Sequence, residues 1–284
     1  WQEPGRKWLT SSDLKQWVDL LRYERYDEAS TETTVGAIVL REAYYAIRPL
    51  LGVKVRRHLQ GVALRGWAER AFPRWSVDRT VDRLLELGLA ATMAQKCVRE
   101  VPFVWFWPKG YSACALVTHD VETGKGLHFC PTLMDIDEAA GIKTSFQLVP
   151  EKRYQVSEPE LEQIRSRGFE INIHDLNHDG HLFRDERKFR QRVQKINEYG
   201  RKFGARGFRA GALYRNQDWF DGFAFEYDMS VPNVAHLDPQ HGGCCTIFPY
   251  FIGNVLELPV TAIQDYSLFH VLHTYSMDVW QAQL

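Results

Sequence analysis

The chain has 284 residues, of which 45% are hydrophobic, and a formal net charge of −1 at pH 7. This length suffices for one large domain, or a domain with an extension, and the hydrophobic content supports a substantial core. The near-neutral charge gives no indication of nucleic acid or an anionic membrane as a partner, and no apolar run reaches the roughly 18 residues of a membrane-spanning helix. No leader is visible, which slightly favours the cytoplasm, although the chain begins at Trp1. The oligomeric state is not defined by these numbers.

The five cysteines are scattered and form no Cys-x-x-Cys pattern. A thiolate zinc site is therefore not expected, and the odd count does not suggest a disulfide framework. Cys114 lies in an apolar run and is expected in a core. Buried packing is also the expected state of the adjacent Cys244 and Cys245, with redox chemistry as the alternative.

Residues 1–110 are expected to form a helical region. The spacing of apolar residues and the breaks at glycine and proline indicate helices over 14–21, 35–51, 53–71 and 81–98. The 53–71 segment is rich in arginine, and we expect a solvated basic face there, with an anionic partner as the alternative. The aromatic stretch 102–108 either packs the helical region onto the C-terminal part of the chain or lines a cleft.

From residue 111 the pattern changes to short strands that alternate with helices. The predicted strands cover 113–118, 144–149, 169–173, 207–209, 227–231 and 255–260. The predicted helices cover 131–140, 158–167, 184–203 and 218–225, and a last one begins near 265. Repeated β-α units imply a parallel sheet, closed or open.

Polar and charged residues follow several of these strands. Asp120 and Glu122 come after the first strand, and Arg209 ends the fourth. His174 and His178 follow the third strand with a spacing that aims two imidazoles at one point. The loops at the carboxyl ends of strands in a β/α barrel share one face, so these side chains are expected to converge there. Two imidazoles and a carboxylate with an open position would make a hydrolytic metal site.

The histidine pair also has other interpretations. A metalloprotease helix would need glutamate at position 175, where this chain has Asp175. Asn177 and Gly180 favour a loop instead. The histidines could be ordinary core or solvated residues, and His181 is an alternative third ligand.

The residues resemble the polysaccharide deacetylase family, the carbohydrate esterases related to nodulation-type chitooligosaccharide deacetylases. Thr118-His119-Asp120-Val121-Glu122 is similar to the Asp-Val-Asp variant of that family's first motif, with glutamate as the second acid. The resemblance implies that Asp120 is the catalytic base and Glu122 a metal ligand. His119 stands where the family has phenylalanine and is expected to be a packing or supporting residue.

The second motif of the family, His-(Ser/Thr)-x-x-His, matches His174 and His178 as metal ligands, with Asp175 at the Ser/Thr position. The third motif begins with an arginine that orients the catalytic aspartate. Arg209 matches it, but Gly211 and Ala212 replace the Pro and Tyr that follow.

The fourth motif is similar to residues 227–232, in the form found in the allantoinase-like branch. There an aspartate contacts the motif-three arginine, and Asp228 is the matching residue. The fifth motif supplies a histidine that acts as the general acid. Residues 256–261 are similar to the strand that precedes it, whereas His270 and His273 lie in a predicted helix, so the acid is expected beyond Leu284 or elsewhere.

The resemblance covers about residues 112–265. It implies an α/β fold, a distorted (β/α) barrel over 111–284 that lacks its last strand or C-terminal motif, with a helical extension over 1–110. It also implies a divalent metal, with zinc expected, and hydrolysis of the N-acetyl amide of an amino sugar in a polysaccharide or oligosaccharide. The alternatives are an allantoinase-like hydrolase of a small non-sugar amide and a non-catalytic glycan-binding barrel.

Overall fold

The computed structural model describes residues 11–28, 47 and 51–284, so the helix expected over 35–51 falls outside the described residues. The chain divides into two compact units, each described here by itself. The first contains Trp1–Phe103, Pro232–Ile247 and Thr261–Leu284, and the second contains Val104–Val231 and Phe248–Val260. Two later segments of the chain thus join the N-terminal helices in one unit.

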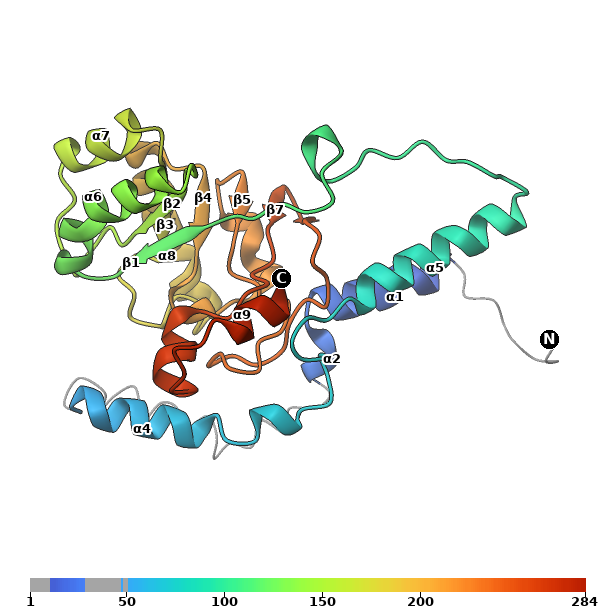
Figure 1. Cartoon of the computed structure of the whole chain (residues 1–284), viewed down its shortest axis with the longest axis horizontal. Coiled ribbons are helices and arrows are strands. Elements are labelled where there is room, and N and C mark those ends of the chain that lie inside the picture. Colours follow the sequence, from blue (N-terminus) through green and yellow to red (C-terminus); the bar gives the residue numbers. More distant parts are fainter. Residues whose placement is uncertain (1–10, 29–46, 48–50) are drawn as a thin grey trace. The chain divides into compact units, whose positions relative to one another are not determined.

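The second unit is built on a seven-stranded sheet (Figure 1). Its strands are β1 Thr118–Val121, β2 Ser145–Leu148, β3 Glu170–His174, β4 Gly207–Arg209, β5 Tyr227–Asp228, β6 Tyr250–Ile252 and β7 Val255–Glu257. The order is β1-β2-β3-β4-β5-β7-β6, and every neighbouring pair is parallel except β6 and β7. The predicted α/β architecture is confirmed. Within the described part of the chain the sheet is open, with β1 and β6 at its edges, so a closed barrel is not formed.

The sheet departs from the sequence prediction at both edges. The first strand begins at Thr118, whereas a strand over 113–118 was predicted. Cys114, which was expected in a core, is exposed. At the other edge, β6 pairs antiparallel with β7 through the turn at Gly253, which has a positive φ of 59°. The apolar run before Thr118 therefore does not enter the sheet, and a short hairpin covers the edge beyond β7.

Three helices of this unit connect the first four strands: α6 Gly124–Ala139, α7 Glu158–Ser166 and α8 Glu186–Phe203. Helix α6 begins earlier than the expected residue 131, because the Thr123 hydroxyl accepts a hydrogen bond from the Gly126 amide at 3.1 Å and caps the helix. Helix α8 is strongly amphipathic. Its buried residues recur at helical spacing and face β3: Phe189, Val193, Ile196, Gly200 and Phe203.

Alternation along the strands separates an apolar face from a polar one. In β3, Ile171 and Ile173 belong to the core, while Asn172 and His174 point to the opposite face. Phe208 of β4 lies beside Ile173 and packs at 4.3 Å, between ring centroids, against Phe223. The polar face therefore carries His174 at the carboxyl end of a buried strand.

The short helical segments of this unit are η3 Pro108–Gly110, η4 Gly211–Leu213 and η5 Gln217–Gly222. The last of these is a 3-10 helix where residues 218–225 were expected to be helical. The aromatic stretch near residue 106 packs within the unit, because the ring of Phe106 stacks on Phe248 with centroids 4.3 Å apart.

The first unit is mainly helical. It contains α1 Ser11–Arg22, α2 Arg25–Glu28, α4 Val53–Ala63, η2 Trp67–Glu69, α5 Thr80–Gln95, the π-helix η6 Ser267–Val271 and α9 Asp278–Gln283. Its core includes Val18, Leu21, Val81 and Cys245, which confirms that Cys245 is buried. The Asn233 side chain donates to the carbonyls of Asp78 and Thr246 and so joins separate segments of the unit. Of the helices in the described ranges, none has the length and apolar character to span a membrane.

Candidate active site

The residues predicted from strand ends meet at the carboxyl edge of the sheet. His174 of β3 lies in register with Arg209 of β4. Asp120 is the next-to-last residue of β1, and Glu122 directly follows that strand. Parallel strands end at one edge, so residues separated by up to 89 positions become neighbours there.

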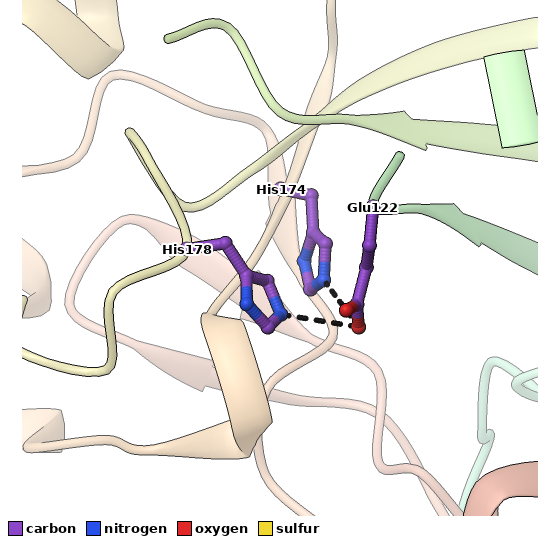
Figure 2. A group of neighbouring side chains, drawn as sticks. All are labelled: Glu122, His174 and His178. Atoms are coloured by element: carbon purple, nitrogen blue, oxygen red, sulfur yellow. Dashed lines mark ion pairs between the residues drawn. The ribbon is translucent and has the colours of Figure 1, made fainter. Parts of the chain in front are cut away.

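Glu122, His174 and His178 form a compact group in which the possible ligand atoms all lie within 4.8 Å of one another. Figure 2 shows both imidazoles turned toward the Glu122 carboxylate. Its Oε1 lies 3.2 Å from His178 Nε2 and 3.9 Å from His174 Nε2. Two nitrogens and one oxygen are the donor set that zinc takes in hydrolytic sites.

The state of the two imidazoles also fits a metal. The Nε2 atoms of His174 and His178 are buried and make no hydrogen bond of good geometry with the described residues. His174 Nδ1 lies 3.1 Å from the Arg209 carbonyl oxygen. A carbonyl can only accept, so this bond places the proton on Nδ1 and leaves the Nε2 lone pair facing Glu122.

His178 is held by Arg153, which follows β2. Arg153 Nη2 donates to the His178 carbonyl oxygen at 2.7 Å and lies 3.2 Å from Nδ1 of the same residue. If His178 binds a metal through Nε2, its Nδ1 must carry the proton. A protonated Nδ1 cannot accept a hydrogen bond from Arg153, and a guanidinium can only donate. A bound metal therefore requires Arg153 to keep the carbonyl bond and give up its contact with Nδ1.

The pKa of Glu122 is determined by burial and by the two imidazoles. Burial by itself would raise the pKa of Glu122, but contact with the two imidazoles outweighs it and holds the pKa far below its ordinary value. Burial lowers the pKa of His174, yet the carboxylates of Asp120 and Glu122 more than compensate and raise it. Each shift favours the ionised form of its group, so the Glu122 carboxylate and the His174 imidazole attract each other.

Asp120 stands beside this group and is fixed by Arg209. Arg209 Nη1 lies 2.9 Å from Asp120 Oδ1 and 2.8 Å from the Thr118 hydroxyl, and its Nε donates to the Met229 carbonyl. Burial opposes ionisation of Asp120, but the Arg209 charge and then that of His174 bring its pKa below the usual value. Its second oxygen lies 3.9 Å from His174 Nε2. An ionised carboxylate therefore faces the metal-competent group.

The segment from Asp175 to His181 is a loop, as Asn177 and Gly180 indicated. Asp175 and His178 have positive φ values of 57° and 52°, which are incompatible with a regular α-helix. The Asn177 side chain accepts from the Asp179 amide at 3.2 Å. These turns let two imidazoles four residues apart point to one side without a helix.

Arg192 of α8 holds the same loop through Asp179. Its two terminal nitrogens lie 2.7 and 2.6 Å from the two oxygens of Asp179, a bidentate pair. Burial opposes ionisation of Asp179, but the bonds from Arg192 lower its pKa well below the usual range. Neither Arg153 nor Arg192 was predicted from sequence, because neither belongs to a motif with a recognisable spacing.

Gly211, at the position of the family's proline, packs directly against Asp175. A Cβ at residue 211 would lie 2.7 Å from Asp175 Oδ2 and 3.1 Å from His178 Cδ2. Asp175 is buried, and one of its oxygens accepts from the Leu176 amide at 2.6 Å. Two of the residues that differ from the motifs the sequence resembles, Asp175 and Gly211, are therefore in contact.

Asp228 belongs to β5, and among the described contacts it makes no direct hydrogen bond to the Arg209 guanidinium. Burial raises the pKa of Asp228 to about 6, and the nearby charge of Arg209 lowers it only in part. Its oxygens accept from the amide and hydroxyl of Ser230, at 2.8 and 2.9 Å. The same hydroxyl accepts from the Ala210 amide at 2.8 Å. Asp228 is in register with Phe208, so it points to the face opposite Arg209. It supports the backbone next to Arg209 instead of its side chain.

The remaining histidines lie outside the group. His119 points away from it and its Nε2 lies 2.8 Å from Asp137 of α6, in keeping with the expected supporting role. His181 Nδ1 lies 3.6 Å from Asp179 and does not join the ligand atoms around Glu122. His270 lies in η6, so the prediction that it is a helix residue is confirmed, and His273 follows that helix.

Comparisons with known proteins add one similarity. No protein-family model matches the chain, and no curated protein does. The chain is similar to a solved structure from Mycobacterium smegmatis, that of a proposed polysaccharide deacetylase. The two share 20% identity with a TM-score of 0.46, over 62% of this chain and 73% of the other. At this level the similarity assigns neither activity nor ligand to this chain.

Proposed function

We propose that this protein is a metal-dependent hydrolase that removes acetyl groups from an N-acetylated amino sugar in a glycan. The observation that carries the proposal is the convergence of Glu122, His174 and His178 beside an arginine-bound Asp120. The sequence motifs that resemble polysaccharide deacetylases supply the substrate class. The geometry of the site supports the proposed reaction class, which is hydrolysis at a polarised carbonyl.

Glu122, His174 and His178 would hold the metal, and zinc suits two imidazoles and one carboxylate. When bound, the metal would polarise the acyl oxygen and lower the pKa of water. The proton on His174 Nδ1, held by the Arg209 carbonyl, keeps the Nε2 lone pair available. Arg153 and Arg192 keep the His178 loop in position.

Asp120 would act as the general base. Arg209 keeps the carboxylate ionised and occupies one of its oxygens. The other oxygen lies toward His174, and the side chain is 25% exposed, so water can reach it. A base with these properties can take a proton from an attacking water. The group around Glu122 contains no third imidazole among the described residues, so the acid that protonates the leaving amine would come from outside this group.

The test combines metal analysis with an activity assay. We expect the purified protein to bind about one zinc ion and to release acetate from N-acetylglucosamine oligomers. Asp120→Asn should keep the metal and lose most activity, in the range of about 10²- to 10⁴-fold for a general base. His174→Ala should lose the metal. Unchanged metal content in His174→Ala would show that the ligand assignment is wrong.

A panel of substrates separates the proposal from its alternatives. Turnover of small amides but not of acetylated sugars would favour an allantoinase-like activity. Metal binding without turnover of either class would favour a glycan-binding module. His181→Ala serves as the matched control for His174→Ala, because His181 belongs to the same loop but lies outside the ligand group.

A further inference from the structure

The first unit contains a segment with a high local positive charge, although the net charge of the whole chain is near zero. The chain has 35 basic and 36 acidic residues, yet between 51 and 68 there are four basic residues and no Asp or Glu. The four are Lys54, Arg56, Arg57 and Arg65. Most of them lie on α4, whose first turn contains no acidic residue. A local field of this kind attracts an anionic partner even when the net charge is near zero.

Part of this charge lines a groove on the surface of the unit. Lys54 and His58 are four residues apart and so share a face of α4, and Arg65 follows in the turn after the helix. Together with Val62 and His273, they line a groove. Every charged or titratable side chain among the lining residues is basic. Lysine and arginine donors around one hollow are suited to phosphate oxygens.

Helix α4 is attached to the rest of the first unit by contacts with η6. Helix α4 lies against η6, and the Tyr266 hydroxyl donates to the Gln60 side chain. Gln60 lies on a different face of the helix from Lys54 and His58, because successive residues are 100° apart. The basic face is therefore left exposed while another face is attached to the unit.

An exposed apolar stripe runs beside the basic one. Val55, Leu59 and Val62 follow at i, i+4 and i+7, and their exposed fractions are 48%, 38% and 42%. At 100° per residue this stripe adjoins the face that carries Lys54 and His58. Apolar side chains next to basic ones on one surface helix form the pattern of helices that lie in a membrane interface.

We propose that α4 and its groove bind the surface of an anionic phospholipid bilayer. Lys54 and Arg65 would contact headgroup phosphates, and Val55, Leu59 and Val62 would enter the boundary between headgroups and acyl chains. The attachment is peripheral and reversible. It is independent of the proposed hydrolase activity, because it uses residues of the other unit.

The experiment is co-sedimentation of the full chain with vesicles. We expect binding to vesicles of equal parts phosphatidylcholine and phosphatidylglycerol, and much weaker binding to pure phosphatidylcholine. Lys54→Glu/Arg65→Glu should weaken binding to the anionic vesicles at least about tenfold, because each basic residue near such a surface contributes severalfold. Leu59→Ser should weaken it about fivefold or less, through lost apolar insertion.

The matched control is Arg187→Glu/Lys202→Glu on α8, which changes the net charge equally with the same residue types. It should bind nearly as well as the wild-type chain, and circular dichroism should confirm that all variants are folded. Equal binding to both vesicle types, or an equal loss in the control, would overturn the proposal. So would inorganic phosphate that fills the groove and abolishes vesicle binding at submillimolar concentration, since this would identify a free-anion site.

Discussion

Asp175 and Gly211 come from different motifs and lie against each other beneath the candidate metal site. In the family that the sequence resembles, these positions hold a small hydroxyl residue and a proline. Here the longer Asp175 side chain points one oxygen at the place where a Cβ of residue 211 would lie, 2.7 Å away. The absence of a side chain at 211 makes room for the carboxylate. These two differences from the motifs that the sequence resembles therefore compensate for each other sterically.

This contact predicts a coupling between the two positions. Gly211→Ala should destabilise the protein by about 1–3 kcal/mol, because overpacking displaces buried groups. Asp175→Ser in the same chain should remove most of that cost. Urea unfolding of the two single variants and the double variant measures the coupling, which we expect to exceed about 0.5 kcal/mol.

Gly124→Ala provides the control for this cycle, since its Cβ would meet only Tyr154 at an ordinary 3.7 Å. This variant should change the free energy of unfolding very little, and its effect should add to that of Asp175→Ser. Additive effects of Gly211→Ala and Asp175→Ser would contradict the coupling.

At the scale of elements, α8 reaches the metal-competent group through the loop after β3. The pair between Arg192 and Asp179 is bidentate, and the Arg192 side chain is only 15% exposed. His178 is the residue before Asp179, so this pair fixes the segment that carries a proposed metal ligand. Partners that orient ligands in this way typically change metal affinity when they are lost.

Arg192→Met should lower zinc affinity about 10- to 100-fold while the fold is retained. Titration with zinc against a competing chelator measures this without any assay of activity. Arg190→Met is the matched control on the same helix, because Arg190 pairs with Asp221 and Glu186 instead of the loop. A variant of Arg192 that binds zinc like the Arg190 variant would show that the pair does not position His178.

At the scale of the whole molecule, a metal held by Glu122 after β1, His174 of β3 and His178 in the loop after β3 should stabilise the native state. A ligand at about 1,000 times its Kd adds about 4 kcal/mol to the free energy of unfolding. For a chain of this size, roughly 2–4 °C in Tm is expected per kcal/mol. Calorimetry with zinc and then with excess EDTA should show a rise and its reversal.

The Glu122→Gln and His174→Ala variants should lose this zinc-dependent shift, whereas His181→Ala should keep it. The same shift in His174→Ala would mean that zinc acts at another place. Only the change between the zinc and EDTA conditions is compared, so the intrinsic stability of each variant does not affect the result.

The sequence by itself determined the parts of the molecule that depend on short-range pattern. Period-two strands that alternate with amphipathic helices predict a parallel sheet, and the ends of parallel strands meet at one edge. That rule is sufficient to predict that Asp120, Glu122, His174 and His178 converge. Asn177 and Gly180 also predicted that the histidine pair lies in a loop, because their turn chemistry is local.

Only the tertiary structure decided features that depend on register and on packing between distant segments. Strand register turns Asp228 away from the Arg209 side chain and onto Ser230. Packing of separate segments brings Arg153 to His178, Arg192 to Asp179 and Gly211 to Asp175. It also leaves the sheet open and places 232–247 and 261–284 with the N-terminal helices. None of these contacts has a signature in the sequence, because each arises from the free energy of burying side chains that lie far apart in the chain.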